Sequence, residues 1–351
     1  MKILRLDIEG YRSLRKVSWV PGDLNVLIGP NGSGKTNVIN VLSLIAVSAQ
    51  GKLKEYVLGQ GGIAPLLWDQ TAQSIFIELE TSPIDSDPDE TRDSLTYRLE
   101  LRRLGSTSSY RVERELLGNF RKVKQGLTDQ PFKFLERDGV RSVVFDEDQR
   151  ALVAYDEVSP EESLLSTAAG PFLANKVVTA FQKKLASWVV YRGIDTGRDA
   201  PVRRPVITRH DTRVAENGRN LTSVLHTFYA RDREFKEDLN RGMKAAFGEA
   251  YQELQFSPVA DQLIQLGVWF QGLSGIRSAA DLSDGTLKFL FLLTLLANPQ
   301  PPCLMAIEEP EAGLHPGMLP IVAEFGADAA NRSQVIFTTH SPEFLDSFRD
   351  V

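Results

Sequence analysis

One stretch of this sequence, GPNGSGKTN at residues 29–37, decides how the rest is interpreted. It fits the pattern G-x-x-x-x-G-K-[ST], with Gly29 and Gly34 as the glycines and with Lys35 and Thr36 after them. Glycines allow the backbone to wrap closely around phosphate oxygens, and amides at the start of a following helix point at the anion. In such a loop the lysine reaches the outer phosphates and the hydroxyl holds magnesium. The stretch therefore predicts a phosphate cradle.

The segments on both sides of the loop have the order that a phosphate site requires. Residues 23–29, DLNVLIG, predict a fully buried strand, and residues 36–48, TNVINVLSLIAVS, predict a helix with one apolar face. Upstream, residues 2–10 alternate apolar and charged side chains, which predicts a strand with one buried face, and a second strand is expected at residues 17–20. A chance glycine-rich turn is the alternative, and it does not explain this order of strand, loop and helix.

The composition sets limits on the class of protein. The chain has 351 residues, a net charge of -6 and one cysteine, Cys303, which lies in an apolar run and is expected to be a small buried side chain. The charge argues against a basic coat for nucleic acid but leaves a local basic face open. The start lacks the apolar core of a signal peptide, and the longest apolar stretches are shorter than the roughly 20 residues of a membrane span. We expect a cytoplasmic protein without a membrane segment.

Two patterns fill the middle of the chain. Short alternating segments separated by turn-prone pieces predict an antiparallel sheet of hairpins at residues 73–155. Helical signals begin where Ser159, Pro160 and Glu162 fit a capping box. Further helices are expected at residues 175–188, 221–230 and 233–247, and a strand at residues 262–271. No heptad run continues over several repeats, so this region is expected to form a compact lobe rather than a coiled-coil arm.

Two carboxylates follow an apolar strand in the segment PCLMAIEEPEAGLHP, residues 302–316. A nucleotide-bound magnesium ion needs a carboxylate at a strand end, and an attacking water needs an acceptor slightly further along. Glu308 is therefore the metal-side candidate, acting through water, and Glu309 the candidate general base. Taken alone, an acidic pair after a strand is more often the start of a helix. The phosphate loop shifts the balance toward the catalytic interpretation.

A histidine ends another apolar strand, in SQVIFTTHSPEF at residues 333–344. His340 could be a satisfied structural residue, but it lies where a sensor of the terminal phosphate is needed. His315 is open between loop packing, a subunit contact and a catalytic part.

The segment LSDGTLKFLFLLTLLA, residues 282–297, places Ser283 and Gly285 at the start of a strongly apolar helix. A hydroxyl and helix-start amides form a second anion-binding end in a chain that already has one cradle. One nucleotide contacted by two such ends suggests two subunits.

Together these segments resemble the ABC-type ATPase heads, in the branch with RecF, SMC-like proteins, OLD and related AAA family ATPases. GPNGSGKTN resembles its Walker A motif, LSDGT its signature, AIEEPEAGLHP its Walker B and D-loop, and FTTHSPEF its switch histidine, all in the family's order. The resemblance implies an α/β fold, a P-loop NTPase head of ABC type with an antiparallel β-subdomain and a helical lobe. We expect one composite head over residues 1–350, with a Walker A lobe at 1–72, the β insert at 73–158, the helical lobe at 159–255 and the signature, Walker B and switch-histidine part at 256–351.

The resemblance also implies a homodimer that holds two ATP molecules with Mg²⁺, each between the loop of one subunit and the signature of the other. Lys35, Glu309 and His340 would be catalytic, and Thr36 and Glu308 would serve the metal. The residues expected to contact nucleotide are Gly29, Asn31, Gly32, Ser33, Gly34, Lys35, Thr36, Asn37, Arg12, Ser283 and Gly285. Arg12 is included among these residues because the first hairpin of this branch carries an arginine that can approach the nucleotide.

The chain departs from the family pattern at several positions. Asp284 stands in the signature where transporters usually have glycine, and Glu308 stands where many relatives have aspartate. The magnesium-sensing glutamine of these heads has three candidates here, Gln50, Gln73 and Gln182. The chain stops about ten residues past His340, where relatives usually continue, so a short member or a truncated chain is expected.

Residues 191–213, YRGIDTGRDAPVRRPVITRHDTR, carry more arginines than aspartates in a loop-like setting. Three roles are open for this segment: contact with DNA or RNA, ordinary surface ion pairs, or docking of an arginine onto the nucleotide site.

The leading functional hypothesis is an ATP-hydrolysing dimeric switch in DNA repair or anti-phage defence, acting with a nuclease or toxin partner. One alternative is the energy subunit of an ABC transporter, which the extended antiparallel insert disfavours. Another is a nucleotide-locked scaffold with little turnover, which the presence of Lys35, Glu309 and His340 disfavours.

Overall fold

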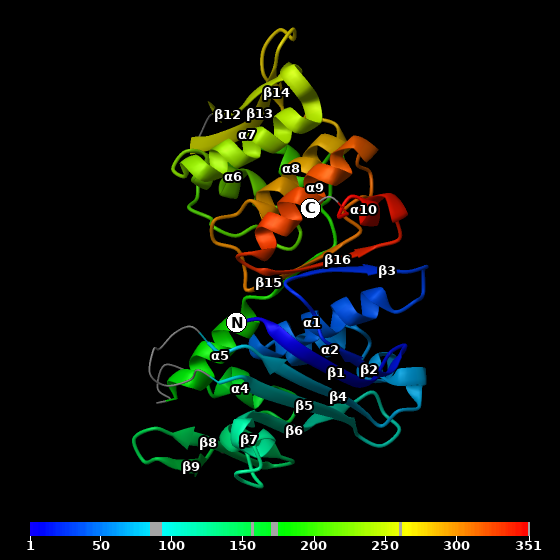
Figure 1. The fold of residues 1–351 in the computed structure, drawn as a ribbon, viewed down its shortest axis with the longest axis vertical. Helices are drawn as coiled ribbons and strands as arrows, with labels where there is room; N and C mark the ends of the chain where they lie inside the picture. The colour runs from blue at the N-terminus through cyan, green and yellow to red at the C-terminus, as the bar shows by residue number, and fades with distance from the viewer. Residues whose placement is uncertain (85–92, 156–157, 170–174, 260–261, 350–351) are drawn as a thin grey trace. The chain divides into compact units, whose positions relative to one another are not determined.

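The computed structural model describes residues 1–84, 93–155, 158–169, 175–259 and 262–349 (Figure 1). The chain divides into two compact units. Unit 1 contains Met1–Gly22 and Gly34–Trp188, and unit 2 contains Asp23–Ser33 and Val189–Val351. The chain therefore passes between the units three times: after Gly22, inside the glycine-rich loop after Ser33, and after Trp188.

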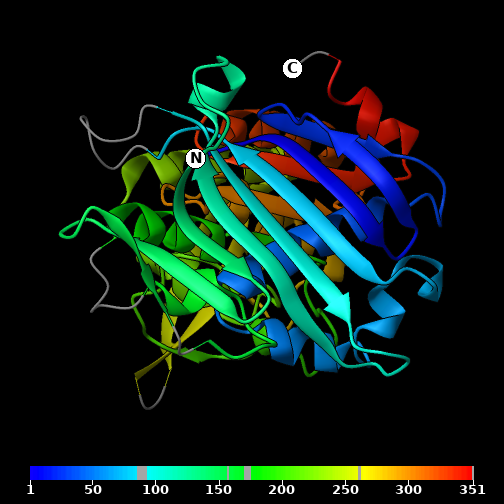
Figure 2. The same cartoon turned by 90° about the horizontal axis from the view of Figure 1, so that it is seen from below.

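Unit 1 is built on an antiparallel sheet in the order β2-β1-β4-β5-β6-β7-β8-β9. Figure 2 shows its strands running side by side. Their bounds are β1 Ile3–Tyr11, β2 Leu14–Trp19, β4 Ser74–Thr81, β5 Leu95–Arg103, β6 Tyr110–Asn119, β7 Phe132–Asp138, β8 Arg141–Asp146 and β9 Ala151–Ala154. The expected hairpins in residues 73–155 are confirmed, and the expected first pair of strands forms β1 and β2.

Alternation along the strands gives this sheet its buried face. In β4 every second side chain is buried, including Ile75, Ile77 and Leu79. The helices of unit 1 are α1 Lys35–Ala49, α2 Leu53–Gly59, α3 Arg121–Lys124, α4 Leu164–Thr167 and α5 Lys176–Ala186. Helix α1 packs on α2, α4 and α5, and the ring of Phe181 on α5 lies 5.9 Å from that of Tyr97 on β5.

Unit 2 contains a parallel sheet in the order β10-β15-β16-β3. Its strands are β10 Val189–Tyr191, β15 Leu304–Glu308, β16 Gln334–Thr339 and β3 Leu24–Ile28. A second, antiparallel sheet contains β11 Val206–Ile207, β12 Tyr251–Val259, β13 Leu263–Phe270 and β14 Arg277–Ser278. The helices are α6 Leu221–Tyr229, α7 Arg233–Phe247, α8 Asp284–Leu296, α9 Leu319–Ala330 and α10 Pro342–Asp346.

Helix α8 forms the centre of the unit 2 core. Nearly all its residues from Thr286 to Leu296 are buried, and it contacts α6, α7 and α9. A helix that is apolar on every face must be covered on every side, which explains why three helices surround it. Its position is therefore held by packing over most of its length, and its first residues project from that core.

Three local expectations are wrong. Strand β3 is half-buried, because it is the edge strand of its sheet, and Cys303 is half-buried just before β15. The capping box at residues 159–162 does not start a helix, since α4 begins at Leu164 with Ser163 as its N-cap. The Glu162 carboxylate instead accepts hydrogen bonds from the amides of Leu53 and Lys54 at the start of α2. Within the described ranges, no helix combines the length and the apolar character that crossing a bilayer needs.

Candidate functional site

The parallel register of unit 2 brings three predicted segments to one edge of the sheet. Glu308 is paired with Thr338, and Thr339 is paired with Ile28. Because parallel strands share a direction, their chains leave the sheet at the same edge. The residues that follow are Glu309 after β15, His340 after β16 and the glycine-rich loop after β3. We call this region the catalytic edge.

The first half of the glycine-rich loop lies in unit 2. The amide of Ser33 donates to the carbonyl of Pro30 at 3.2 Å, which closes a turn, and Asn31 and Gly32 are exposed at its tip. A Cβ at Gly29 would lie 2.9 Å from the Ser33 hydroxyl oxygen, so a larger residue would displace that side chain. This turn keeps the backbone open at the tip, as a phosphate cradle requires.

The second half of the loop starts helix α1 in unit 1. Gly34 has φ 97°, a left-handed value that favours glycine, and its carbonyl accepts from the amides of Asn37 and Val38. A Cβ at Gly34 would also lie 3.2 Å from the Leu14 side chain. Lys35 is half-buried in the first turn of α1, and Thr36 is exposed there. The helix begins where the pattern predicted it.

Asn37 and Arg12 are both engaged within unit 1. Asn37 donates its side-chain amide to the hydroxyl of Ser13 at 2.7 Å, which ties the β1–β2 turn to the first turn of α1. Arg12 occupies that turn with φ 46° and donates to the side chain of Gln60. Its Nε is buried and has no hydrogen-bond partner among the described residues. In the β1–β2 turn, the Arg12 guanidinium thus has one nitrogen without a partner among the described residues. The next residue, Ser13, contacts the start of α1.

Glu308 has the environment expected of a metal-side carboxylate. Its side chain is 13% exposed, and Oε2 lies 3.1 Å from Nε of Arg192, which follows strand β10. The other oxygen, Oε1, is buried and has no hydrogen-bond partner in the described part of the chain. A buried carboxylate oxygen without a donor is costly, and a cation or its bound water would satisfy it. The residues present therefore fit magnesium.

Glu309 and His340 face each other on the catalytic edge. Nε2 of His340 lies 2.9 Å from Oε1 of Glu309, and the two side chains are 38% and 49% exposed. Glu309 has φ 46°, a value that costs energy for a residue other than glycine. Its amide still donates to the carbonyl of Thr338, so the strand pairing holds the strained residue in place. A histidine in contact with a carboxylate can fix its orientation toward a reacting water.

Glu311 also belongs to the catalytic edge, and sequence reasoning missed it. One of its oxygens accepts from the hydroxyl of Thr339 and, at 3.4 Å, from the amide of His340. Its other oxygen is buried without a partner among the described residues. Glu311 thus connects the segment after β15 to the residues that end β16. The only signal in the sequence was a third glutamate in EEPEAGLHP.

The signature residues cap helix α8. Ser283 is its exposed N-cap, and its hydroxyl accepts from the Thr286 amide at 3.2 Å. A Cβ at Gly285 would lie 3.0 Å from the carbonyl of Gly313, so glycine allows the start of α8 to approach the segment after β15. Lys288 donates to the neighbouring carbonyl of Ala312 at 3.3 Å. Ser283 and Gly285 therefore lie at the helix start, as predicted.

The structure also gives contacts for the residues whose roles the sequence left open. His315 caps a 3₁₀ turn, with Nδ1 accepting from the amide of Gly317 at 3.1 Å, a contact that fits the loop-packing alternative. Gln50, Gln73 and Gln182 each donate a side-chain amide to a backbone carbonyl within unit 1. In the arginine-rich segment, Arg204 pairs with Asp199 at 3.2 Å. Arg192 reaches the catalytic edge by its contact with Glu308.

The fold is that of a P-loop ATPase head of the ABC and SMC type. A family model described as "AAA domain, putative AbiEii toxin, Type IV TA system" matches residues 24–346, and the chain belongs to that family. The family is one of P-loop ATPases, which bind nucleotide. No curated protein matches the chain.

One solved structure supports the fold, and a second, weaker match is reported beside it. An SMC head bound to the C-winged helix domain of ScpA matches with a TM-score of 0.56 at 15% identity, covering 99% of this chain and 92% of that one. The SMC head domain from Thermotoga maritima matches with a TM-score of 0.47 at 14% identity, covering 99% and 93%. At these identities the likeness concerns the fold alone.

Proposed function

We propose that this chain hydrolyses ATP and that two copies close around the nucleotide. The proposal rests mainly on the catalytic edge, where the glycine-rich loop, Glu308, Glu309 and His340 leave neighbouring parallel strands at the same level. Each of these parts answers a need of phosphoryl transfer to water, namely a cradle, a metal ligand, a base and a group that orients the base.

In this proposal the chain's own residues have separate roles. The phosphates are held by the side chains of Lys35 and Asn37 and by backbone amides of the glycine-rich loop, those of Gly29, Asn31, Gly32, Ser33 and Gly34. Thr36 and Glu308 hold Mg²⁺, which neutralises charge on the phosphates. Glu309 accepts a proton from the attacking water, and His340 keeps its carboxylate oriented.

The second copy completes the site through its signature. Ser283 is exposed at the start of a thirteen-residue helix that is buried from Thr286 to its end, apart from Lys288. Helix-start amides attract anions, and burial of the rest of α8 makes this end a rigid contact surface. Contact of Ser283 and Gly285 with the nucleotide on another copy would make closure depend on ATP.

The family description names a putative toxin of a type IV toxin–antitoxin system, which supports a role in such a system. In our hypothesis, the ATP-driven switch acts on a toxin or nuclease partner. The hypothesis also includes DNA or RNA as a ligand. The structural match to an SMC head bound to ScpA is consistent with a head that carries a second protein, since that head does so.

The proposal is tested with Glu309→Gln, which should bind ATP but not release it by hydrolysis. Light scattering with ATP should give the mass of two chains, and without ATP the mass of one. Lys35→Ala is the matched control, because it should lose ATP binding in calorimetry and keep the mass of one chain. A Glu309→Gln protein saturated with ATP that keeps the mass of one chain would contradict the proposal.

A further inference from the structure

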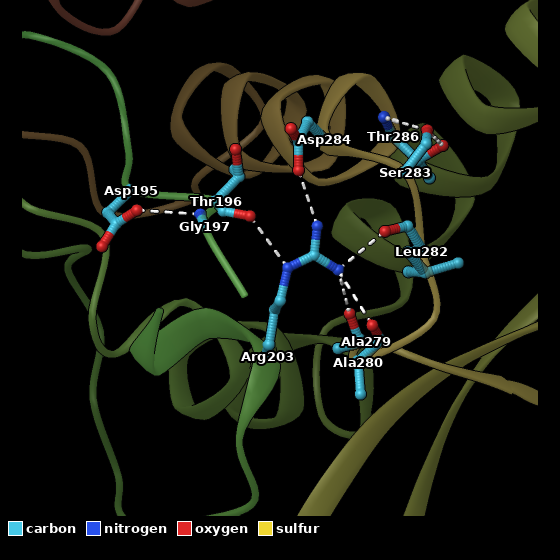
Figure 3. A network of polar contacts seen from close by, with 10 residues as sticks. All are labelled: Asp195, Thr196, Gly197, Arg203, Ala279, Ala280, Leu282, Ser283, Asp284 and Thr286. Carbon is cyan, nitrogen blue, oxygen red and sulfur yellow. Dashed lines mark hydrogen bonds and ion pairs between the residues drawn. The ribbon is translucent and has the colours of Figure 1, made fainter. Parts of the chain in front are cut away.

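One largely covered arginine organises the segment that leads into helix α8 (Figure 3). Arg203 lies at the end of a 3₁₀ turn over Pro201–Arg203, and its side chain is 10% exposed. Motif reasoning placed it among several arginines of a loop and gave it no individual role. In the structure, its guanidinium points away from solvent into the residues just before the signature.

Within the described residues, the Arg203 guanidinium donates five hydrogen bonds to acceptors of its own chain. Nη1 donates to the carbonyls of Ala279, Ala280 and Leu282 at 3.0, 3.1 and 2.7 Å, Nη2 donates to Oδ1 of Asp284 at 2.7 Å, and Nε donates to the carbonyl of Thr196 at 2.9 Å. Three of these carbonyls come from four consecutive residues that end just before Ser283. A planar guanidinium with donors on three nitrogens fixes the path of such a segment more tightly than a single hydrogen bond can.

Electrostatics argue that this arrangement is not there to stabilise helix α8. A cation near a helix start opposes the helix dipole, which favours anions at that end. Asp284, in the first turn of α8, supplies the favourable charge, and its side chain is 67% exposed. That carboxylate would repel a phosphate brought to the same helix end. The ion pair with Arg203 offsets the repulsion.

We infer that Arg203 is a positioning residue for the nucleotide site of a second copy, holding Ser283 in place and neutralising Asp284. The inference rests on the proposed function, because it needs the signature to contact a nucleotide bound elsewhere. It also gives a physical account of the aspartate in LSDGT: this signature tolerates an acid because an arginine from a remote segment compensates for it.

The first test compares Arg203→Ala with Arg204→Ala, whose side chain is 63% exposed and makes a surface ion pair. In a Glu309→Gln background, Arg203→Ala should leave the affinity of the single chain for a fluorescent ATP analogue unchanged and raise the dissociation constant of ATP-dependent pairing about tenfold or more. Arg204→Ala should change neither. Adding Asp284→Gly to Arg203→Ala should recover part of the lost pairing, which a purely structural defect would not do. Wild-type pairing by Arg203→Ala would overturn the inference.

Mixed pairs show which site is damaged. In an equal mixture, Arg203→Ala with Lys35→Ala should recover up to about a quarter of the wild-type turnover, because half of the encounters bring the two variants together and each such pair has one complete site of two. Arg203→Ala mixed with Ser283→Arg should recover none, since both lack a working signature. The mixture of Ser283→Arg with Lys35→Ala tests the proposed function alone. If that mixture recovers turnover and Arg203→Ala with Lys35→Ala does not, the inference fails while the proposed function stands.

Arg203→Lys covers the case in which Arg203→Ala does not fold. Lysine keeps the charge near Asp284 but cannot reproduce the planar fork. Pairing should therefore be weakened severalfold in a protein whose thermal unfolding remains cooperative. Pairing of Arg203→Lys at wild-type strength would contradict the claim that the fork positions the signature.

Discussion

The catalytic edge and the start of helix α8 lie in the same unit, yet they are built in different ways. At the catalytic edge the candidate groups are side chains: Glu309 and His340 are each partly exposed and contact each other, and among the described residues Glu308 has one satisfied and one unsatisfied oxygen. At the start of α8 the candidate groups are mostly backbone, and one largely covered arginine, Arg203, holds them.

This difference teaches how each region can fail. A side-chain site loses its reaction when one group is replaced, while its shape is kept by the sheet below it. A backbone site keeps its chemical groups under most substitutions and loses their position instead. The two regions should therefore give opposite results in assays that separate turnover from pairing.

The largest effect is expected from Glu309→Gln at the catalytic edge. Loss of a general base should lower ATP turnover by about 100-fold or more, while ATP binding and pairing persist. A phosphate-release assay under saturating ATP measures the rate, and Glu324→Gln, a substitution of an exposed glutamate on α9, is the control that should leave it unchanged. Turnover at the normal rate in Glu309→Gln would remove that residue from the base role.

The opposite result is expected from Ser283→Arg at the start of α8. A bulky cation at this exposed N-cap should weaken ATP-dependent pairing by about two orders of magnitude, because it would be buried in the shared contact. Binding of ATP to the single chain should be unaffected, since the glycine-rich loop is intact. Sedimentation with and without ATP measures the pairing, and Ser106→Arg, in the exposed turn between β5 and β6, is a size-matched control. A Ser283→Arg protein that pairs normally would break the comparison between the two regions.

A smaller effect, on the free energy of unfolding alone, is expected from replacing Glu115 in unit 1. This carboxylate is fully buried and accepts from the amides of Leu164 and Leu165 at the start of α4, so it holds a helix start as Arg203 does. Burial raises the pKa of Glu115 above its usual range. The folded chain therefore keeps this proton at a pH where the unfolded chain has lost it.

The sign of the pH dependence follows from that shift. The contribution of Glu115 to the free energy of unfolding is fully present below the ordinary glutamate pKa of about 4.3 and is lost as pH rises through the raised pKa. Urea unfolding across this range should show the decline in the wild type and a flatter profile in Glu115→Gln. Turnover per folded chain should not change between the two proteins. If the free energy of unfolding changed with pH in the same way in both proteins, Glu115 would not be the cause of the pH dependence.

Much of the fold could be predicted because it depends on local patterns. The strand, loop and helix around residues 29–37, the hairpins of residues 73–155 and helices α5, α6 and α7 follow from periodicity, turn residues and glycine positions. The burial of β3 could not, because edge position depends on which strands pair. The capping box at Ser159 failed because the Glu162 side chain is used by a different helix, α2.

The candidate site divides in the same way. Glu308, Glu309 and His340 could be chosen because each follows an apolar strand, and the register places all three at one edge. Glu311 and Arg203 could not, since their partners are defined only by the folded chain. For Arg203 the bonded carbonyls lie 76 or more positions away in the sequence, apart from that of Thr196.

The central claim, that one nucleotide is gripped by the loop of one copy and by the signature of another, is tested most directly by cross-linking between copies. Chains with Asn31→Cys would be mixed with chains with Ser283→Cys, both in a Cys303→Ala, Glu309→Gln background, and treated with a short bifunctional thiol reagent. With ATP, the mixture should yield a covalent dimer that neither preparation forms alone and that is absent without ATP. Single chains alone, in a mixture shown to be saturated with ATP, would contradict the account.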